Sequence, residues 1–126
     1  MKLFETTVNA RAGNSHITVG PGVLRQIGAV AQKTVKGRRA CVVTDSNVCN
    51  LHLSPVMESL EANGFEAEQV SVPAGENSKS LEMVSTLWNT FNGYKITRTD
   101  LIVALGGGVV GDLAGFAAAT YLRGVA

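Results

Sequence analysis

From residue 40 onward, short apolar runs alternate with segments whose apolar residues recur at helical spacing. We expect strands at 40–44, 67–72 and 101–105, and helices at 53–62, 78–92 and 109–122. Three strand–helix units in succession predict a parallel sheet, because parallel neighbours need crossover connections, which are usually helices. The pattern therefore favours an α/β fold with a doubly wound sheet.

The segment before residue 40 follows other patterns. Residues 2–8 and 15–19 alternate apolar and polar side chains, which predicts a β-hairpin turning at Ala12-Gly13-Asn14. Helical spacing then predicts a helix from Val23 to about Val35, with Gly37 as a suitable stop. A chain of 126 residues fits one domain, 1–126, that is large enough to bury a core.

Two of the expected helices have clear apolar faces, which we expect to pack against the sheet. These faces consist of Leu53, Val56, Met57 and Leu60 in the first, and of Leu81, Val84, Leu87, Trp88 and Phe91 in the second.

Composition narrows the classes of function. Apolar residues make up 45% of the chain and charged residues 17%, which is typical of a soluble globular protein. A net charge of +1 without a basic stripe argues against nucleic-acid binding. Glycines and Asp112 interrupt the apolar stretch 101–122, so we expect no membrane span. Cys41 and Cys49 lack metal-ligand spacing, and as reduced thiols they would suit a cytoplasmic protein.

Segments rich in glycine and polar residues follow each expected strand of the sheet. They are residues 45–47, 75–79 and 106–112. In an open parallel sheet the carboxyl ends of the strands lie along one edge, where ligands bind. The sequence therefore predicts one crevice formed by three loops.

The segment from Gly106 to Gly111 has the spacing G-x-G-x-x-G between an expected strand and an expected helix. Glycines there allow backbone N–H groups to approach a pyrophosphate at the positive end of the helix. This favours dinucleotide binding in a Rossmann-like arrangement, and a close-packed strand–helix turn is the alternative. A kinase-type phosphate loop is excluded because Asp112 stands where that pattern requires lysine.

Several polar residues near these loops are candidate ligand contacts. Asp45 can accept hydrogen bonds from ribose hydroxyls or can cap a turn. Asp112 can bind substrate hydroxyls or place negative charge at a helix N-terminus. His16 and His52 have no partner at metal-ligand spacing, and no side chain has the context of an activated nucleophile, so we assign no metal ligand and no catalytic residue.

Glu76 and Lys79 lie at the expected start of a helix that Asn77 or Ser78 can cap. They form either part of the ligand site or a solvated ion pair. Arg123, at the far end of the last helix, can bind phosphate or pair with the helix dipole.

Residues 101–125, LIVALGGGVVGDLAGFAAATYLRGV, closely resemble the signature block of 3-dehydroquinate synthases. Residues 73–80 resemble the second NAD segment of that family, and residues 43–47 resemble the first, in the same order. The resemblance covers essentially the whole chain. It implies a Rossmann-like N-terminal NAD-binding domain.

The resemblance also implies roles for individual residues. NAD would contact Asp45, Asn47, Gly75, Glu76, Lys79, Gly107, Gly108, Val109 and Gly111. The sugar-phosphate substrate would contact Asp112 and, from a neighbouring subunit, Arg123, which implies a homodimer.

Enzymes of this family convert 3-deoxy-D-arabino-heptulosonate 7-phosphate to 3-dehydroquinate and phosphate, in the shikimate pathway toward aromatic amino acids. They use NAD and a divalent metal, zinc or cobalt, which is held by a helical C-terminal domain. By the resemblance that domain would follow Ala126, so we expect a truncated chain that binds NAD weakly and is inactive alone. The alternatives are another sugar-phosphate cyclase, a glycerol-dehydrogenase relative, or a non-catalytic nucleotide-binding module.

Overall fold

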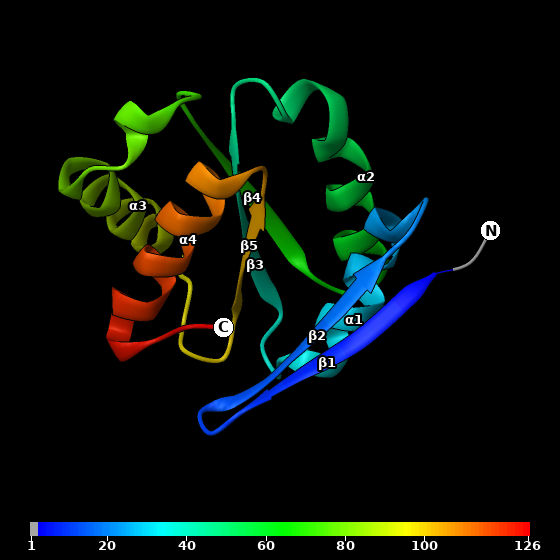
Figure 1. Ribbon diagram of the computed structural model, residues 1–126. Helices are drawn as coiled ribbons and strands as arrows, with labels where there is room; N and C mark the ends of the chain where they lie inside the picture. Colours follow the sequence, from blue (N-terminus) through cyan, green and yellow to red (C-terminus); the bar gives the residue numbers. More distant parts are fainter. Residues whose placement is uncertain (1–2) are drawn as a thin grey trace.

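The computed structural model describes residues 3–126 and confirms an α/β fold with an N-terminal hairpin (Figure 1). Lys2, which we expected in the first strand, lies outside the described residues. The strands are β1 (Phe4–Ala10), β2 (Gly13–Val19), β3 (Arg39–Asp45), β4 (Glu66–Val72) and β5 (Leu101–Leu105). The α-helices are α1 (Ile27–Thr34), α2 (Cys49–Ala62), α3 (Leu81–Gly93) and α4 (Gly108–Thr120). Short 3-10 helices are η1 (Val23–Gln26), η2 (Glu76–Ser78) and η3 (Tyr121–Arg123).

The parallel sheet has the strand order β4–β3–β5, and the hairpin forms a separate antiparallel ribbon. Helices α1 and α2 cover one face of the sheet, and α3 and α4 cover the other (Figure 1). Because β3 is central and covered on both faces, residues 40–44 are all 0% exposed. Within the described residues, no helix is long and apolar enough to cross a membrane.

Alternating side chains of β3 divide the core into two layers. Cys41 and Val43 pack with α3 and α4, where the ring of Phe91 meets Tyr121 edge-on at a centroid distance of 5.4 Å. Val42, on the other face of β3, packs with α1 and α2 in the second layer. Five residues of the expected apolar faces are buried in these layers, namely Val56 and Leu60 of α2 and Val84, Leu87 and Phe91 of α3.

Helix α2 begins at Cys49, whereas we predicted its start at residue 53. Asp45 explains the difference, because its Oδ1 accepts hydrogen bonds from the backbone N–H groups of Asn47, at 2.9 Å, and Val48, at 2.8 Å. These bonds order the turn before the helix. Residues 50–52 of the first turn are exposed, so no apolar periodicity marks them.

The start of α3 also differs from the prediction. Ser80 caps this helix by accepting a hydrogen bond from the N–H of Met83 at 3.1 Å, whereas we expected Asn77 or Ser78 as the cap. Ser78 lies in η2 and donates its hydroxyl to the carbonyl of Pro73. Leu81, predicted to face the core, is instead 77% exposed.

Strand β5 lies at an edge of the described sheet and is partly exposed, although we expected both of its faces to be covered. The backbone N–H of Ile102 donates to the carbonyl of Ala126 at 2.7 Å, so the last residues run beside this strand. In the hairpin, β2 begins at Gly13, and the turn is therefore tighter than predicted.

Thr44 is fully buried, and its hydroxyl has no hydrogen-bond partner among the described residues. We expect Thr44→Val to raise the free energy of unfolding by about 1 kcal/mol, because it replaces an unsatisfied hydroxyl with a methyl group of similar volume. Urea denaturation checks this. The control is Thr86→Val. The Thr86 hydroxyl is exposed and donates to the carbonyl of Glu82 at 3.0 Å, so this substitution should change the free energy of unfolding by less than about 0.5 kcal/mol. A less stable Thr44→Val protein would contradict the prediction.

Asp100 is buried and directly precedes β5. It accepts hydrogen bonds from Arg39 N at 3.1 Å and from Thr97 N at 2.8 Å. Burial acts to raise the pKa of its carboxyl group, but these bonds and one from the Thr97 hydroxyl outweigh burial and lower that pKa. We expect Asp100→Asn to lower the free energy of unfolding by about 2 kcal/mol near neutral pH.

The pH dependence of this effect follows from the lowered pKa. The stabilisation is complete above the unfolded pKa, near 4, and is lost as the pH falls through the folded pKa. Urea denaturation of both proteins from about pH 7 down to about pH 2 should show their stabilities converging in acid. A difference that stays constant over this range would contradict the prediction.

Candidate functional site

Three loops that follow the sheet strands meet at one edge of the molecule (Figure 1). The strand ends are level, since Asp45 pairs with Val72 and Thr44 pairs with Leu105. The loop after β3 is bonded to the loop after β4, because Ser46 donates its N–H to Val72 O at 3.1 Å and accepts from Ala74 N at 3.2 Å.

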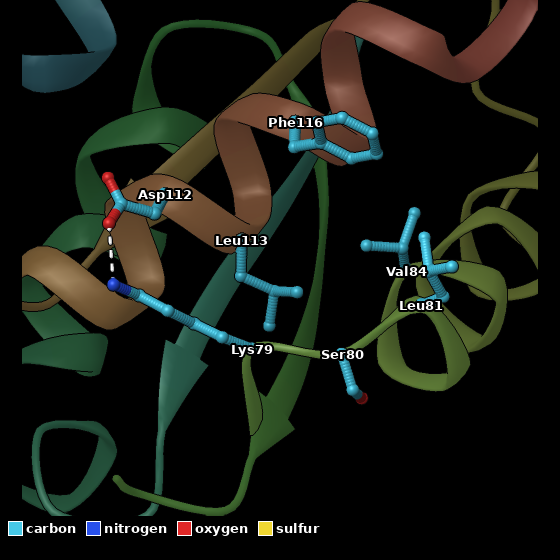
Figure 2. Close-up of a pocket in the computed structure, with 7 residues that line it drawn as sticks. All are labelled: Lys79, Ser80, Leu81, Val84, Asp112, Leu113 and Phe116. Carbon is cyan, nitrogen blue, oxygen red and sulfur yellow. Dashed lines mark ion pairs between the residues drawn. The ribbon is translucent and has the colours of Figure 1, made fainter. Parts of the chain in front are cut away.

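The loop after β4 is joined to the start of α4 by an ion pair. Lys79 Nζ lies 2.9 Å from Asp112 Oδ2 (Figure 2). The same nitrogen lies 3.3 Å from Glu76 Oε2. Asp45, Lys79 and Gly108 therefore belong to elements on the same side of the protein, as an arrangement for one shared ligand requires.

The glycine turn leaves the N-terminus of α4 uncapped by any side chain. Gly107 is the N-cap residue and has an extended backbone, with φ −87° and ψ −157°. Its carbonyl accepts the first helical bond, from Gly111 N at 3.0 Å. The N–H groups of the first turn have no partner within the helix, which gives this end a positive partial charge.

Space around the glycines distinguishes a packing role from a binding role. A Cβ atom on Gly106 would lie 2.8 Å from a side-chain methyl group of Val110, so glycine is needed there for strand–helix packing. A Cβ atom on Gly107, Gly108 or Gly111 would meet nothing within 4 Å. The close-packed-turn interpretation thus accounts for Gly106, and it does not account for Gly107, Gly108 or Gly111, which have open space at the Cβ position.

Electrostatics at this edge centre on Lys79. Its pKa is raised, first by the hydrogen bond to Asp112 and then by the bond to Glu76, while burial acts in the opposite direction. Lys79 therefore stays protonated through the physiological range. The ion pairs hold its side chain between Glu76 and Asp112, so the lysine links the loop after β4 to α4.

A pocket of 340 Å³ lies next to this ion pair, between α3 and α4 (Figure 2). Lys79 and Asp112 form its polar end, and its apolar wall is formed by Leu81, Val84, Leu113 and Phe116. Neither Asp45 nor the glycine turn lines it. The pocket borders the predicted crevice and is not the crevice itself.

The remaining predicted cofactor residues lie on the same edge. Asp45 caps the turn before α2, one of the two roles we considered, and both of its bonds use Oδ1. Asn47 is exposed beside it. Gly75 has φ +109°, a conformation that favours glycine, and its carbonyl accepts from Ser78 N at 3.1 Å. Val109 is half-buried in the first turn of α4.

Arg123 is the one predicted site residue that the fold places elsewhere. It is exposed at the far end of α4, about 20 Å from Gly108 along a helix of 13 residues. Leu122 and Arg123 both have left-handed backbones, with φ 50° and 65°. Arg123 cannot contact a ligand at the glycine turn of its own chain.

Sequence reasoning missed Ser46 as the residue that ties two of the loops together, and a serine one position after a strand carries no specific signal. Cys41 is buried, and burial, with the nearby charge of Glu68, raises its pKa to about 12, which makes the thiol inert. Within residues 3–126, no cluster of His, Cys, Asp and Glu side chains is arranged to hold a metal.

Comparison with protein families and curated proteins gives a consistent result. Residues 69–126 match the family described as "3-dehydroquinate synthase N-terminal". The chain is 48% identical over 110 residues, 86% of its length, to 3-dehydroquinate synthase of Symbiobacterium thermophilum, of which it covers 31%. It is 41% identical over 122 residues, 97% of its length, to that of Enterococcus faecalis, of which it covers 34%. The chain thus spans about a third of the length of these relatives.

Solved structures of similar fold include 2-deoxy-scyllo-inosose synthase complexed with carbaglucose-6-phosphate, NAD+ and Co2+. This match has a TM-score of 0.86 and 22% identity, and it covers 98% of the present chain and 34% of the other. At that identity the likeness establishes the fold only. The 2-epi-5-epi-valiolone synthase of Streptomyces hygroscopicus, with NAD+ and Zn2+ bound, matches with a TM-score of 0.70 and 26% identity, over 84% of this chain and 29% of that one. The family match over residues 69–126 and the curated relatives agree that the chain is similar to 3-dehydroquinate synthases, and the matched family model describes the N-terminal part of those enzymes.

Proposed function

We propose that this chain, 1–126, is the NAD-binding part of a 3-dehydroquinate synthase. In that enzyme 3-deoxy-D-arabino-heptulosonate 7-phosphate is converted to 3-dehydroquinate and phosphate. The observation that carries the proposal is the open glycine turn at the start of α4, which lies on the same edge as Asp45 and the Lys79–Asp112 ion pair. We include the family's role in the shikimate pathway and a cytoplasmic location in the proposal, and both thiols are free, as such a location requires.

The cofactor would be held by groups from all three loops. Backbone N–H groups at Gly107, Gly108 and Val109 would bind the pyrophosphate, since they face an uncapped helix end with room beside it. Gly111, one turn further, borders the groove between α4 and β5 and leaves space on that side of the helix.

The adenosine side of the cofactor would lie against the loop after β3. Asp45 would accept hydroxyl hydrogen bonds through Oδ2, because Oδ1 already caps the turn, and Asn47 would lie next to it. From the loop after β4, Gly75, Glu76 and Lys79 would close the other side. NAD, when bound, supplies a transient hydride acceptor for a ring hydroxyl of the substrate.

The chain's own residues orient the substrate in this proposal. Asp112 would accept hydrogen bonds from substrate hydroxyls, with Lys79 holding its carboxylate in place. The exposed position of Arg123 is consistent with phosphate binding in a neighbouring subunit of a homodimer. The described residues do not fit the family's divalent metal, so we assign no step in this chain to it.

Two experiments test the proposal. Calorimetric titration of this chain with NAD should show weak binding, because in this proposal the chain supplies one wall of the cofactor cleft. A protein of the relatives' length that includes these residues should turn over the heptulosonate phosphate. NAD binding without turnover in the longer protein would instead favour a non-catalytic nucleotide-binding module.

The second candidate function is that of another sugar-phosphate cyclase, because the fold matches that of 2-deoxy-scyllo-inosose synthase with a TM-score of 0.86. A glycerol-dehydrogenase relative is a more distant alternative, with a TM-score of 0.63 for the enzyme from Schizosaccharomyces pombe. Assaying the longer protein with glucose 6-phosphate, sedoheptulose 7-phosphate and glycerol separates these alternatives. Preference for any of them over the heptulosonate would contradict the proposal.

A further inference from the structure

A second cavity lies at the end of the sheet opposite the three loops. It has a volume of 460 Å³ and is lined by residues 32–38 and by Phe65. Helix α1 ends within this range, and Arg38 and Phe65 directly precede β3 and β4. Because β3 and β4 are parallel, these residues lie at the amino ends of the strands, whereas the predicted crevice lies at the carboxyl ends. Strand β3 has 7 residues, so about 20 Å separates the two regions.

The cavity is lined by three positively charged side chains and by no negatively charged one. Lys33, Lys36 and Arg38 are exposed, and within residues 3–126 none of them forms an ion pair. By contrast Arg39, the next residue along the chain, lies 3.4 Å from the carboxylate of Glu66. We call the cavity lined by residues 32–38 and Phe65 the basic pocket.

Two helix ends account for part of this positive charge. Helices α1 and α2 both end beside the pocket, where Gln32 Nε2 donates to Asn63 O at 3.3 Å. Each helix C-terminus carries a partial charge of about −0.5, which lysine and arginine side chains commonly offset. Two such ends supply about −1 against three cations, which leaves an excess of about two positive charges. Helix capping alone therefore does not explain the pocket.

Backbone contacts hold the segment that carries these cations. Gly37 donates its N–H to Thr99 O at 2.8 Å, and a Cβ atom on it would lie 2.5 Å from the same oxygen, so the two segments pack closely there. The carbonyl of Arg38 accepts from Glu66 N at 2.7 Å. Lys36 and Arg38 flank Gly37, so their backbone is positioned before any ligand binds. Such preorganisation lowers the entropic cost of binding.

We propose that the basic pocket binds the polyphosphate group of a small molecule, at a site separate from the predicted crevice. Lysine and arginine are the side chains that bind phosphate oxygens, and an excess of about two positive charges suits a pyrophosphate group. The volume of 460 Å³ falls within the range of small-molecule sites, about 300–1,000 Å³. Phe65 is 5% exposed, so it offers no free aromatic face for stacking a base. The inference does not depend on the proposed enzymatic function.

The first test is calorimetric titration of the full chain with inorganic pyrophosphate. The chain carries Gly107→Val, so that an anion at the N-terminus of α4 does not contribute. Arg38→Gln should raise the dissociation constant at least about tenfold, because a hydrogen bond to a charged group is lost, and Lys36→Gln should act in the same direction. Arg11→Gln removes the same charge from an exposed residue of the hairpin turn and should change it less than about twofold. No binding, or equal effects of Arg38→Gln and Arg11→Gln, would overturn the proposal.

The second test locates the bound anion. In the Gly107→Val chain, pyrophosphate should shift the backbone amide NMR signals of residues 32–38 more than those of residues 106–112. The largest shifts at any other surface would contradict the proposal. Sulfate at the same ionic strength should bind at least about tenfold more weakly, because it spans fewer of the cations. Equal affinity for the two anions would mean that the pocket attracts charge without forming a site, and the proposal would be wrong.

Titration with ADP distinguishes two sources of the polyphosphate group. Equal affinity for ADP and pyrophosphate would assign recognition to the phosphates alone, which the buried Phe65 leads us to expect. Tighter binding of ADP would identify a nucleotide as the ligand. In both cases Arg38→Gln should weaken ADP binding as much as it weakens pyrophosphate binding, and ADP binding that is insensitive to this substitution would count against the pocket.

Discussion

Replacing Gly107 with valine is expected to weaken NAD binding at least about 100-fold, the largest functional effect of a single substitution in this chain. A side chain at this position would occupy the space beside the α4 N-terminus that a pyrophosphate needs for close approach to the backbone. The extended backbone of Gly107 suits valine, and a Cβ there meets nothing within 4 Å. The free energy of unfolding should therefore change by less than about 0.5 kcal/mol.

Calorimetric NAD titration of the protein of the relatives' length, together with urea denaturation, measures both quantities. The control is Gly93→Val, which also places a Cβ in open space but lies at the end of α3, away from the crevice. It should leave NAD affinity unchanged. Unaltered affinity in Gly107→Val would show that the cofactor does not bind against this turn.

The largest effect on stability is expected from Phe91→Ala, which should lower the free energy of unfolding by about 3–5 kcal/mol. Phe91 is 0% exposed and lies edge-on to Tyr121 in the layer between the sheet and helices α3 and α4. Loss of the ring leaves a cavity that the surrounding side chains fill only in part. Since a domain of this size has a total stability of about 5–15 kcal/mol, the variant should be close to unfolding.

Urea denaturation measures this effect, and Phe116→Ala is the matched control. Phe116 is 51% exposed on the next helix, so removal of its ring should cost less than about 1 kcal/mol. Similar losses for the two substitutions would mean that the layer described above is not the main core of the protein.

The candidate site depends on where side chains meet across loops, and this explains which of its features were predictable. Periodicity and glycine placement correctly indicated three loops at one sheet edge, because strands followed by helices must be parallel. The ion pair between Lys79 and Asp112 joins residues far apart in the chain, so no local sequence pattern predicts it. Ser46 connects two loops for the same reason and was missed.

Local capping errors have a related cause. Asn77, Ser78 and Ser80 are all suitable N-caps by residue type, and the turn of η2 decides in favour of Ser80. Leu81 fits the apolar period of its helix, yet it lies in the first turn and is exposed, whereas Val84, Leu87 and Phe91 further along are buried. Apolar spacing identifies which side of a helix faces the core, but not how far along the helix the core extends.

By itself, the sequence determined the α/β class, the order of the strands and helices, the family resemblance and the place of the glycine turn, because each follows from residues close together in the chain. Only the tertiary structure decided that Gly106 is needed for packing while Gly107 and Gly108 stay open, and that Arg123 lies apart from the crevice. It also decided that the hairpin turns its apolar face outward. Those features depend on distances between distant segments, which residue spacing does not record.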